Sequence, residues 1–253
     1  MVTFLPLAPR FVVRWVAKRY MAGESLEQAI EVMEALSSEG ACFTVDVLGE
    51  EIKSLEESSW FIDEYEKVLD AIVDRGIDAS ISIKPTALGL LIDKETSHSN
   101  IERIVRKASE TGIFVRLDME DNRATQATID AAKAMHSKGL TNVGVVLQGR
   151  MFRTPDDIFE MSHATGIQTD FRICKGIYLE PPEIAYTRYR DIVDATNRAV
   201  DKMLDSGAYT AIASHDLPVI EHSLKALESR GLGPGKKDPR HATPVGSSKG
   251  KGP

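Results

Sequence analysis

Short apolar runs alternate with amphipathic stretches along most of the chain. Six of the runs are strand-like: ACFTVDVLG, DASISIK, GIFVRLDM, NVGVVLQ, TDFRICKGIY and YTAIASHD. Each of the first five is followed by a stretch with helical spacing of apolar residues, and the sixth leads into LPVIEHSLKALESRG. The unit recurs about every 30 residues, which is the length of a strand–helix–strand unit. The pattern therefore predicts a parallel sheet with right-handed crossovers.

Polar residues at alternate positions of two predicted strands favour a barrel over an open sheet. The positions are Ser80, Ser82 and Lys84 in one strand and Arg116, Asp118 and Glu120 in the next. An open parallel sheet is covered by helices on both faces and stays apolar, whereas a barrel interior accepts polar groups near its carboxyl-terminal mouth. No G-x-G-x-x-G motif follows the first strand. We predict an α/β fold, a parallel (β/α)8-type, TIM-like barrel that is incomplete, with about six strands.

The two ends of the chain differ from the repeating part. Residues 1–40 are expected to form N-terminal helices, and Ser25 and Gln28 have the spacing of a capping box. Residues 41–230 would hold the six barrel units. Residues 231–253 are rich in glycine, proline and lysine and are expected to be disordered. Because two more units would need about 60 residues, we expect a truncated chain or an open six-stranded version.

Charge and composition narrow the classes of partner. The 253 residues carry a net charge of -7, which disfavours a nucleic-acid partner. The sequence contains no run of 18 apolar residues, so it predicts no transmembrane helix. Cys42 and Cys174 lie in apolar runs and are expected to be buried, reduced thiols, as in a cytoplasmic protein.

The first twenty residues carry four basic side chains and no acidic one. Phe11, Val12, Trp15 and Val16 can share one face of a helix with basic residues on its flanks. One interpretation is a packing helix with solvated charges. The other is a helix that contacts anionic lipid, which would place the protein peripherally at the inner face of the membrane.

Charged and polar residues gather where the predicted strands end. They are Asp46, Glu50, Lys84, Asp118, Glu120, Gln148, Arg172, Lys175, Tyr178, His215 and Asp216. In a parallel barrel these positions meet at one mouth, where the active sites of this fold lie. The set therefore predicts a site.

Three kinds of chemistry fit that set of residues. Lys84 or Lys175, with a lowered pKa, could form a Schiff base. The carboxylates and His215 could bind a metal ion, but metal-ligand spacing such as His-x-His is missing, so we predict no metal. Gln148 and Arg172, with Lys84, could hold an electron-rich ring and a carboxylate, as in a flavin site. The spacing of these residues does not decide between the Schiff-base and the flavin chemistry.

Strand alternation separates the two cations of the fifth predicted strand. Arg172, Cys174, Gly176 and Tyr178 share one face, and Lys175 lies on the other. Either Gly176 bends the strand end, or Lys175 serves through its backbone and turns outward. We therefore expect Arg172 and Tyr178 on the site side and a backbone role for Lys175.

Six motifs occur in order along the chain: FTVDVLGEE, SIKPTALGL, VRLDMED, VGVVLQGRMFRT, FRICKGIYLEP and IASHD. Together they resemble the proline dehydrogenases, in particular the monofunctional bacterial kind, from about residue 22 to about residue 232. The resemblance implies an FAD-dependent barrel of proline catabolism. Such an enzyme oxidises L-proline to Δ1-pyrroline-5-carboxylate and passes the electrons to membrane quinone.

The resemblance also implies roles for individual residues. Arg172, near the reactive nitrogen of the flavin, and Asp118, beside flavin and substrate, would be catalytic. Lys84 would help hold the substrate carboxylate, and Tyr178 would lie near the substrate. The cofactor contacts would be Gln148, Arg172, Lys175, Gly176, Ile177, Ser214 and His215.

The chain departs from the family pattern at three places. Pro85 stands where leucine is usual, and Gly149 and Arg150 follow Gln148 where Gln-Ala-Tyr is common. The family's seventh strand is missing, as is the last helix with a tyrosine and paired arginines that clamp the proline carboxylate. One lysine does not replace a bidentate arginine contact. Two alternatives therefore stay open: an inactive flavin-binding remnant or interaction protein, and a Schiff-base lyase or aldolase barrel using Lys84.

Overall fold

The fold is a single curled sheet of parallel strands covered by helices on one side. The computed structural model describes residues 25–164 and 169–232. Its strands are β1 (Phe43–Asp46), β2 (Ala79–Ile83), β3 (Val115–Leu117), β4 (Val143–Gln148), β5 (Asp170–Cys174) and β6 (Tyr209–Ile212). They pair in chain order from β1 to β6, and every pair is parallel. The predicted incomplete barrel is confirmed.

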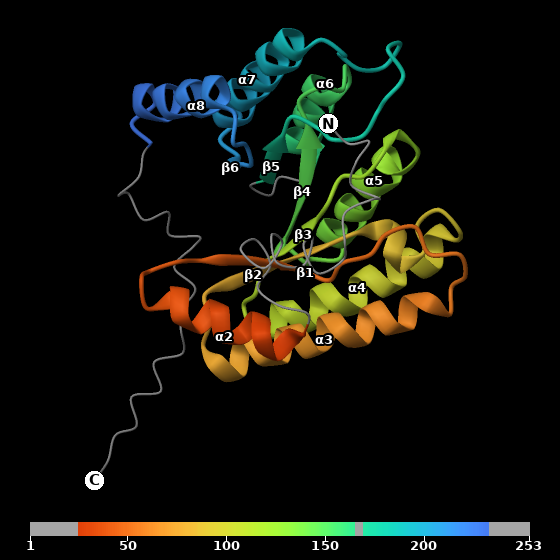
Figure 1. Cartoon of the computed structure of the whole chain (residues 1–253). Helices are drawn as coiled ribbons and strands as arrows, with labels where there is room; N and C mark the ends of the chain where they lie inside the picture. Colours follow the sequence, from red (N-terminus) through yellow and green to blue (C-terminus); the bar gives the residue numbers. More distant parts are fainter. Residues whose placement is uncertain (1–24, 165–168, 233–253) are drawn as a thin grey trace, which may run out of the picture.

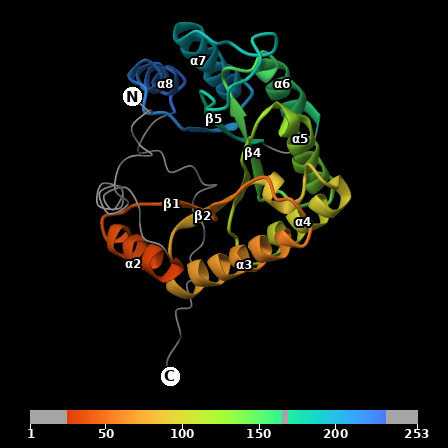
Figure 2. The same cartoon turned by 45° about the vertical axis from the view of Figure 1, so that its right-hand side comes forward.

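The helices lie on the convex side of the curl; α2 precedes β1, and the others follow the strands in order. They are α2 (Leu26–Ser37), α3 (Glu57–Arg75), α4 (Lys94–Glu110), α5 (Asn122–Ser137), α6 (Thr154–Ala164), α7 (Tyr189–Asp205) and α8 (Leu217–Ser229), with the 3-10 helix η2 (Pro85–Leu88) after β2. Figure 2 shows them as an arc around the strands, with α2 at one end and α8 at the other. The concave side carries no helix in the described part of the chain (Figures 1 and 2).

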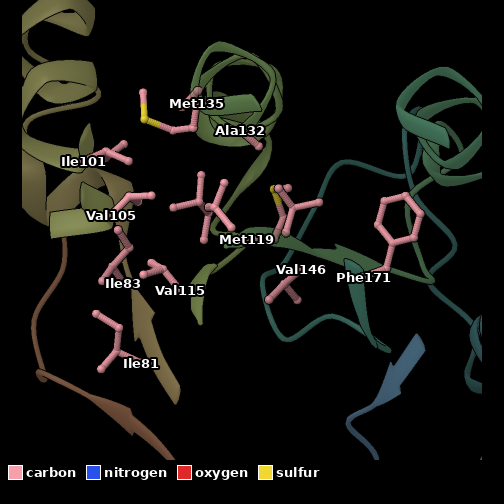
Figure 3. Close-up of a cluster of buried hydrophobic side chains, with 14 of the residues drawn as sticks. Ile81, Ile83, Ile101, Val105, Val115, Met119, Ala132, Met135, Val146 and Phe171 are labelled. Carbon is pink, nitrogen blue, oxygen red and sulfur yellow. The ribbon is translucent and has the colours of Figure 1, made fainter. Parts of the chain in front are cut away.

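Alternation along the strands decides which side chains face the helices. Ile81 and Ile83 of β2 are fully buried in the main core, together with residues of α4 and α5 (Figure 3). Full burial of each such side chain contributes about 1.5–3 kcal/mol. A one-residue slip of β2 would exchange these isoleucines with Ser82 and Lys84, so the core fixes which residues face the concave side.

The helix termini follow local signals. Ser25 accepts a hydrogen bond from the Gln28 N–H at 3.4 Å, as the capping-box spacing predicts. Gly76 ends α3 in the left-handed conformation, with φ of 61°. One boundary differs from the apparent sequence pattern. Helix α4 begins six residues before NIERIVRKASETG, because the Asp93 carboxylate caps it by accepting the Thr96 N–H at 2.7 Å.

Neither cysteine is fully buried, as both were expected to be. Cys42 is exposed, not buried as expected, because it lies just before β1 and donates its Sγ hydrogen to Asp78. Cys174 is partly buried. The basic N-terminal segment and residues 233–253 of the expected tail lie outside the described residues. None of the helices in the described ranges combines the length and the apolar character that a membrane span requires.

Candidate functional site

A charged cluster occupies the concave side where β1, β2 and β3 end. Lys84 directly follows β2, and its Nζ forms an ion pair with Asp46, the last residue of β1. The same Nζ lies 4.0 Å from Asp118 Oδ2, one residue past β3. Asp118 Oδ1 accepts a hydrogen bond from Ser82 Oγ at 2.7 Å. Three adjacent strands thus bring one cation between two carboxylates.

Electrostatics keep this lysine protonated. Burial alone would lower the pKa of Lys84, but the hydrogen bond and charge of Asp46 and the charge of Asp118 outweigh it, so its pKa is raised. Burial raises the pKa of Asp46 despite the nearby ammonium group. A Schiff-base lysine requires a lowered pKa. The environment of Lys84 therefore disfavours the lyase or aldolase alternative.

Arg172 of β5 reaches across the concave side to the first strands. Its guanidinium donates to Thr44 Oγ1 of β1 at 3.2 Å and to Ser82 Oγ of β2 at 3.4 Å, and it lies 3.5 Å from Asp118 Oδ1. Burial lowers the pKa of Arg172, and the nearby positive charge of Arg116 lowers it further. The curl therefore places the guanidinium of a fifth-strand arginine beside the charged cluster of the first three strands.

The segment after β5 forms the mouth of the site. Tyr178 donates its hydroxyl hydrogen to Glu50, in the segment after β1, at 3.0 Å. Burial and the Glu50 carboxylate raise the pKa of this hydroxyl. Nearby in sequence, Ile177 and Leu179 are 86% and 97% exposed, and Leu48 after β1 is 81% exposed.

Gln148 and Gly176 leave a cradle at the end of β4. Gln148 is buried and its Nε2 donates to the Glu120 carbonyl at 2.7 Å, whereas its Oε1 is buried without a hydrogen-bond partner. Gly176 has a φ of 98°, and a Cβ there would clash with Gln148 Oε1 and the Arg150 side chain. The unpaired Oε1 of Gln148 can accept a hydrogen bond from an N–H group of a bound ring. Gly176, which has no side chain, lets such a ring approach closely.

Arg150 holds the segment that carries Gly176 and Tyr178. It is 7% exposed, and its guanidinium donates to the carbonyls of Tyr178 and Tyr186, the latter at 3.3 Å. The sequence marks Arg150 only as a departure from a family pattern. The structure shows the segment after β5 anchored to the end of β4 through this side chain.

The remaining predicted cofactor contacts follow the ends of β5 and β6. Lys175 pairs with Asp216 Oδ2 at 2.5 Å, and its own carbonyl accepts the Arg150 N–H at 3.1 Å. Ser214 Oγ accepts the Asp216 N–H at 3.1 Å. His215 is exposed. The Lys175 side chain therefore points to the segment after β6, and Gly176 bends the chain beside it.

Besides Arg150, three residues were missed as site candidates. The Tyr65 hydroxyl of α3 lies 3.1 Å from Asp46 Oδ1 and 2.9 Å from the Ser82 carbonyl, so its one hydrogen is shared between these two acceptors. Thr86 of η2 binds Glu120, and Thr44 binds Arg172. Tyr65 occupies a core position of an amphipathic helix, so no sequence signal separated it from packing residues. In the described ranges, no group of three or more His, Cys, Asp or Glu side chains is arranged to hold a metal ion.

Comparisons with known proteins agree on one family. The family model described as proline dehydrogenase matches residues 29–234. A proline dehydrogenase of Deinococcus radiodurans is 33% identical over 222 residues, which cover 86% of this chain and 71% of that protein. Proline dehydrogenase 2 of Bacillus subtilis is 31% identical over 219 residues, covering 87% of this chain and 71% of that protein.

Solved structures show the same fold. The chain matches proline utilization A (PutA) from Bdellovibrio bacteriovorus, inactivated by N-propargylglycine, with a TM-score of 0.79 and 20% identity. It matches PutA of Bradyrhizobium japonicum with a TM-score of 0.69 and 17% identity. The match covers 85% of this chain but 27% of the first structure, and 81% but 24% of the second. The chain thus spans about a quarter of these much longer proteins.

Proposed function

The chain belongs to the proline dehydrogenase family, and we propose that it uses FAD to oxidise L-proline to Δ1-pyrroline-5-carboxylate, with quinone as the electron acceptor. The single observation that carries this proposal is the position of Arg172. On the concave side of the sheet, its guanidinium lies 3.5 Å from Asp118 Oδ1, and Lys84 Nζ lies 4.0 Å from the other oxygen of the same carboxylate. A half-buried cation at that place can stabilise negative charge that develops on a bound ring.

The chain's residues fit a flavin. Gln148 would offer its orphaned Oε1 to a ring N–H, and Gly176 leaves room for close approach of a ring. Ile177 would supply apolar contact, and Lys175, Ser214 and His215 would contact the outer parts of the cofactor. When bound, the flavin would accept the hydride that leaves the substrate.

The charged cluster would bind the substrate. The Lys84 ammonium group would contact the proline carboxylate, and Asp118 would keep that ammonium group oriented from 4.0 Å away. Tyr178, at the mouth, would cover the substrate ring and exclude water. Arg172 would remain protonated and place its charge near the reacting atoms. In this arrangement the protein supplies orientation and electrostatics, and no side chain acts as a nucleophile.

The absorbance of the purified protein tests the proposal directly. After addition of FAD and removal of excess, we expect flavin bands that bleach when proline is added without oxygen. Arg172→Ala should slow bleaching by a larger factor than it destabilises the fold, and the exposed control Arg188→Ala should change neither. Equal losses in bleaching and in stability would mean that Arg172 is structural. Failure to bind FAD would refute the cofactor assignment.

The same experiment separates the alternatives. Flavin bands that proline does not bleach would identify the inactive flavin-binding remnant or interaction protein. A colourless protein that traps a carbonyl substrate on Lys84 with borohydride would identify the lyase or aldolase. Reduction of a soluble quinone in step with proline oxidation tests the acceptor.

A peripheral location at the inner face of the membrane belongs to the same proposal. It depends on the basic segment that contains Arg10, Arg14 and Lys18, which lies outside the described residues. Co-sedimentation with anionic but not with neutral vesicles is the expected result. Equal sedimentation with both would favour a cytoplasmic protein without lipid contact.

A further inference from the structure

The carboxyl group of Glu120 has no part in the function proposed above, yet it is buried at the end of β3, with 4% of the residue exposed. Both of its oxygens accept hydrogen bonds from one residue. The Thr86 N–H donates to Oε2 at 3.0 Å, and the Thr86 hydroxyl donates to Oε1. Thr86 lies in η2, two residues after Lys84. Glu120 thus fixes the segment that carries the lysine of the charged cluster.

Thr86 also binds the segment after β1, so Glu120 and this segment are held by the same residue. Its Oγ1 accepts the Glu51 N–H at 2.9 Å, so the hydroxyl hydrogen points to Glu120 and a lone pair points to Glu51. Glu51 has a φ of 51°, in the left-handed region that non-glycine residues rarely adopt. Because that conformation is unfavourable on its own, the segment depends on the contacts that hold it.

Glu50, the residue before Glu51, connects this segment to the mouth of the site. Glu50 accepts the Tyr178 hydroxyl hydrogen at 3.0 Å. On the other side, the Glu120 carbonyl accepts Gln148 Nε2 at 2.7 Å. A continuous set of hydrogen bonds therefore runs from Gln148 through Glu120, Thr86 and the segment after β1 to Tyr178.

Protonation of Glu120 changes this set of hydrogen bonds. A proton on Oε2 would oppose the Thr86 N–H. A proton on Oε1 would reverse the other hydrogen bond, with Glu120 donating to Thr86 Oγ1, and would leave the Thr86 hydroxyl hydrogen without that acceptor. Only the ionised carboxylate accepts both hydrogen bonds at once, each with the help of its charge. Protonation therefore either opposes the Thr86 N–H or replaces a charge-assisted hydrogen bond with a weaker neutral one.

The surroundings of Glu120 let both forms occur near neutral pH. Burial raises the pKa of Glu120 to about 7, the two Thr86 hydrogen bonds lower it, the Glu50 charge raises it and the Lys84 charge lowers it. Glu51 is paired with Arg123 on the outer side of the same segment.

We propose that Glu120 is a positioning residue whose ionised form holds the segment after β1, and through Glu50 the Tyr178 side chain, in the geometry that binds substrate. The part of this proposal that concerns proline rests on the proposed function. Protonation of Glu120 then loosens the mouth without touching the reacting atoms. Proline affinity falls as pH decreases from 8 to 6, while the maximal rate stays the same.

Hydrogen exchange of the Glu51 amide tests the coupling without cofactor or substrate. In the full chain, protection corrected for the intrinsic exchange rate should be about tenfold greater at pH 8 than at pH 6, the effect of one hydrogen bond to a charged group. Glu120→Gln should give the low value at both pH values. Glu160→Gln, an exposed carboxylate on α6, is the matched control and should behave as the wild type.

Two results would overturn the coupling: equal protection of the wild type at both pH values, or an unchanged pH dependence in Glu120→Gln. If Glu120→Gln does not fold, the wild-type titration alone decides. Thr86→Ser keeps the hydroxyl and should keep the pH dependence, whereas Thr86→Val should remove it.

Kinetics then test the link to substrate. In FAD-loaded protein, the wild-type KM for proline should approach that of Glu120→Gln at pH 6 and lie about tenfold below it at pH 8, with similar kcat. The comparison cancels the ionisation of proline, which affects both proteins equally. An identical KM for both proteins at pH 8 would refute the link. If FAD never binds, the proposed function fails, and amide exchange still decides the coupling.

Discussion

Removal of the Lys84 ammonium group gives the sharpest test of the charged cluster. In Lys84→Met the apolar part of the side chain is largely kept, but Asp46 and Asp118 lose the cation between them. Two partly buried carboxylates then face each other. Removal of one partner of a buried ion pair leaves an uncompensated charge and destabilises the fold.

The magnitude follows from the geometry. The Nζ–Oδ2 distance to Asp118 is 4.0 Å, and the Lys84 and Asp46 side chains are 17% and 26% exposed. At that distance one pair contributes about 4 kcal/mol for the effective dielectric constant of a site near a protein surface. Removal of the lysine also abolishes its own desolvation cost. We therefore expect a net loss of about 2 to 4 kcal/mol in the free energy of unfolding at pH 8.

The loss should depend on pH with a defined sign. Burial already raises the pKa of Asp46, and Lys84 lowers it by hydrogen bond and charge, so removal of Lys84 raises the folded-state pKa further above the unfolded value. A carboxyl group with a raised folded-state pKa binds more protons in the folded state. Stability then falls as pH rises from the unfolded through the folded pKa. The loss should be small at pH 4 and full at pH 8.

Urea unfolding at pH 4 and pH 8, followed by circular dichroism, measures this effect. Lys225→Met, on an exposed position of α8, is the control and should change stability little at either pH. Addition of Asp46→Asn to Lys84→Met should recover at least half of the loss, because the unpaired carboxylate is gone. Equal losses at both pH values, or a double variant less stable than the single one, would refute the electrostatic reasoning.

Three further substitutions test the mouth. Gly176→Ala should destabilise the fold by more than about 1 kcal/mol and abolish FAD binding, because φ is 98° and a Cβ would clash with Gln148 Oε1; normal FAD binding would contradict this. Arg150→Met should leave two carbonyls without donors and increase protease cleavage after β5; unchanged cleavage would show that the segment holds itself. Tyr178→Phe should raise the KM for proline about fivefold through loss of the hydrogen bond to Glu50, with kcat unchanged; an unchanged KM would remove that role.

The strands and their order could be predicted because each signal is local. Alternation within β2 separates Ile81 and Ile83 from Ser82 and Lys84, and this same alternation decides both the core and the concave side. Pairing of neighbours in chain order then follows from the short repeat. The curl was expected from polar residues at interior positions, and the contact of Arg172 with β1 shows its extent.

The partners within the site could not be read from the sequence. Tyr65 contributes to the cluster from the buried face of an amphipathic helix. Arg150 binds backbone carbonyls, which are the same for every residue type and therefore leave no signal in the sequence. The raised pKa of Glu120 depends on its burial, a property of the fold and not of the VRLDMED motif. Such contacts depend on the relative placement of several strand ends, whereas helix and strand signals depend on a few neighbouring residues.

The contact between Arg172 and Thr44 also bears on how the site forms and opens. Strands that pair only with their sequence neighbours can be added one unit at a time, whereas this contact and the Tyr178–Glu50 contact each join residues 128 positions apart. Few long-range contacts of this kind have to break before the mouth opens, and the pairing of the strands is left intact. The site should therefore be a separate, less stable cooperative unit, which opens under conditions where the sheet and its core stay folded.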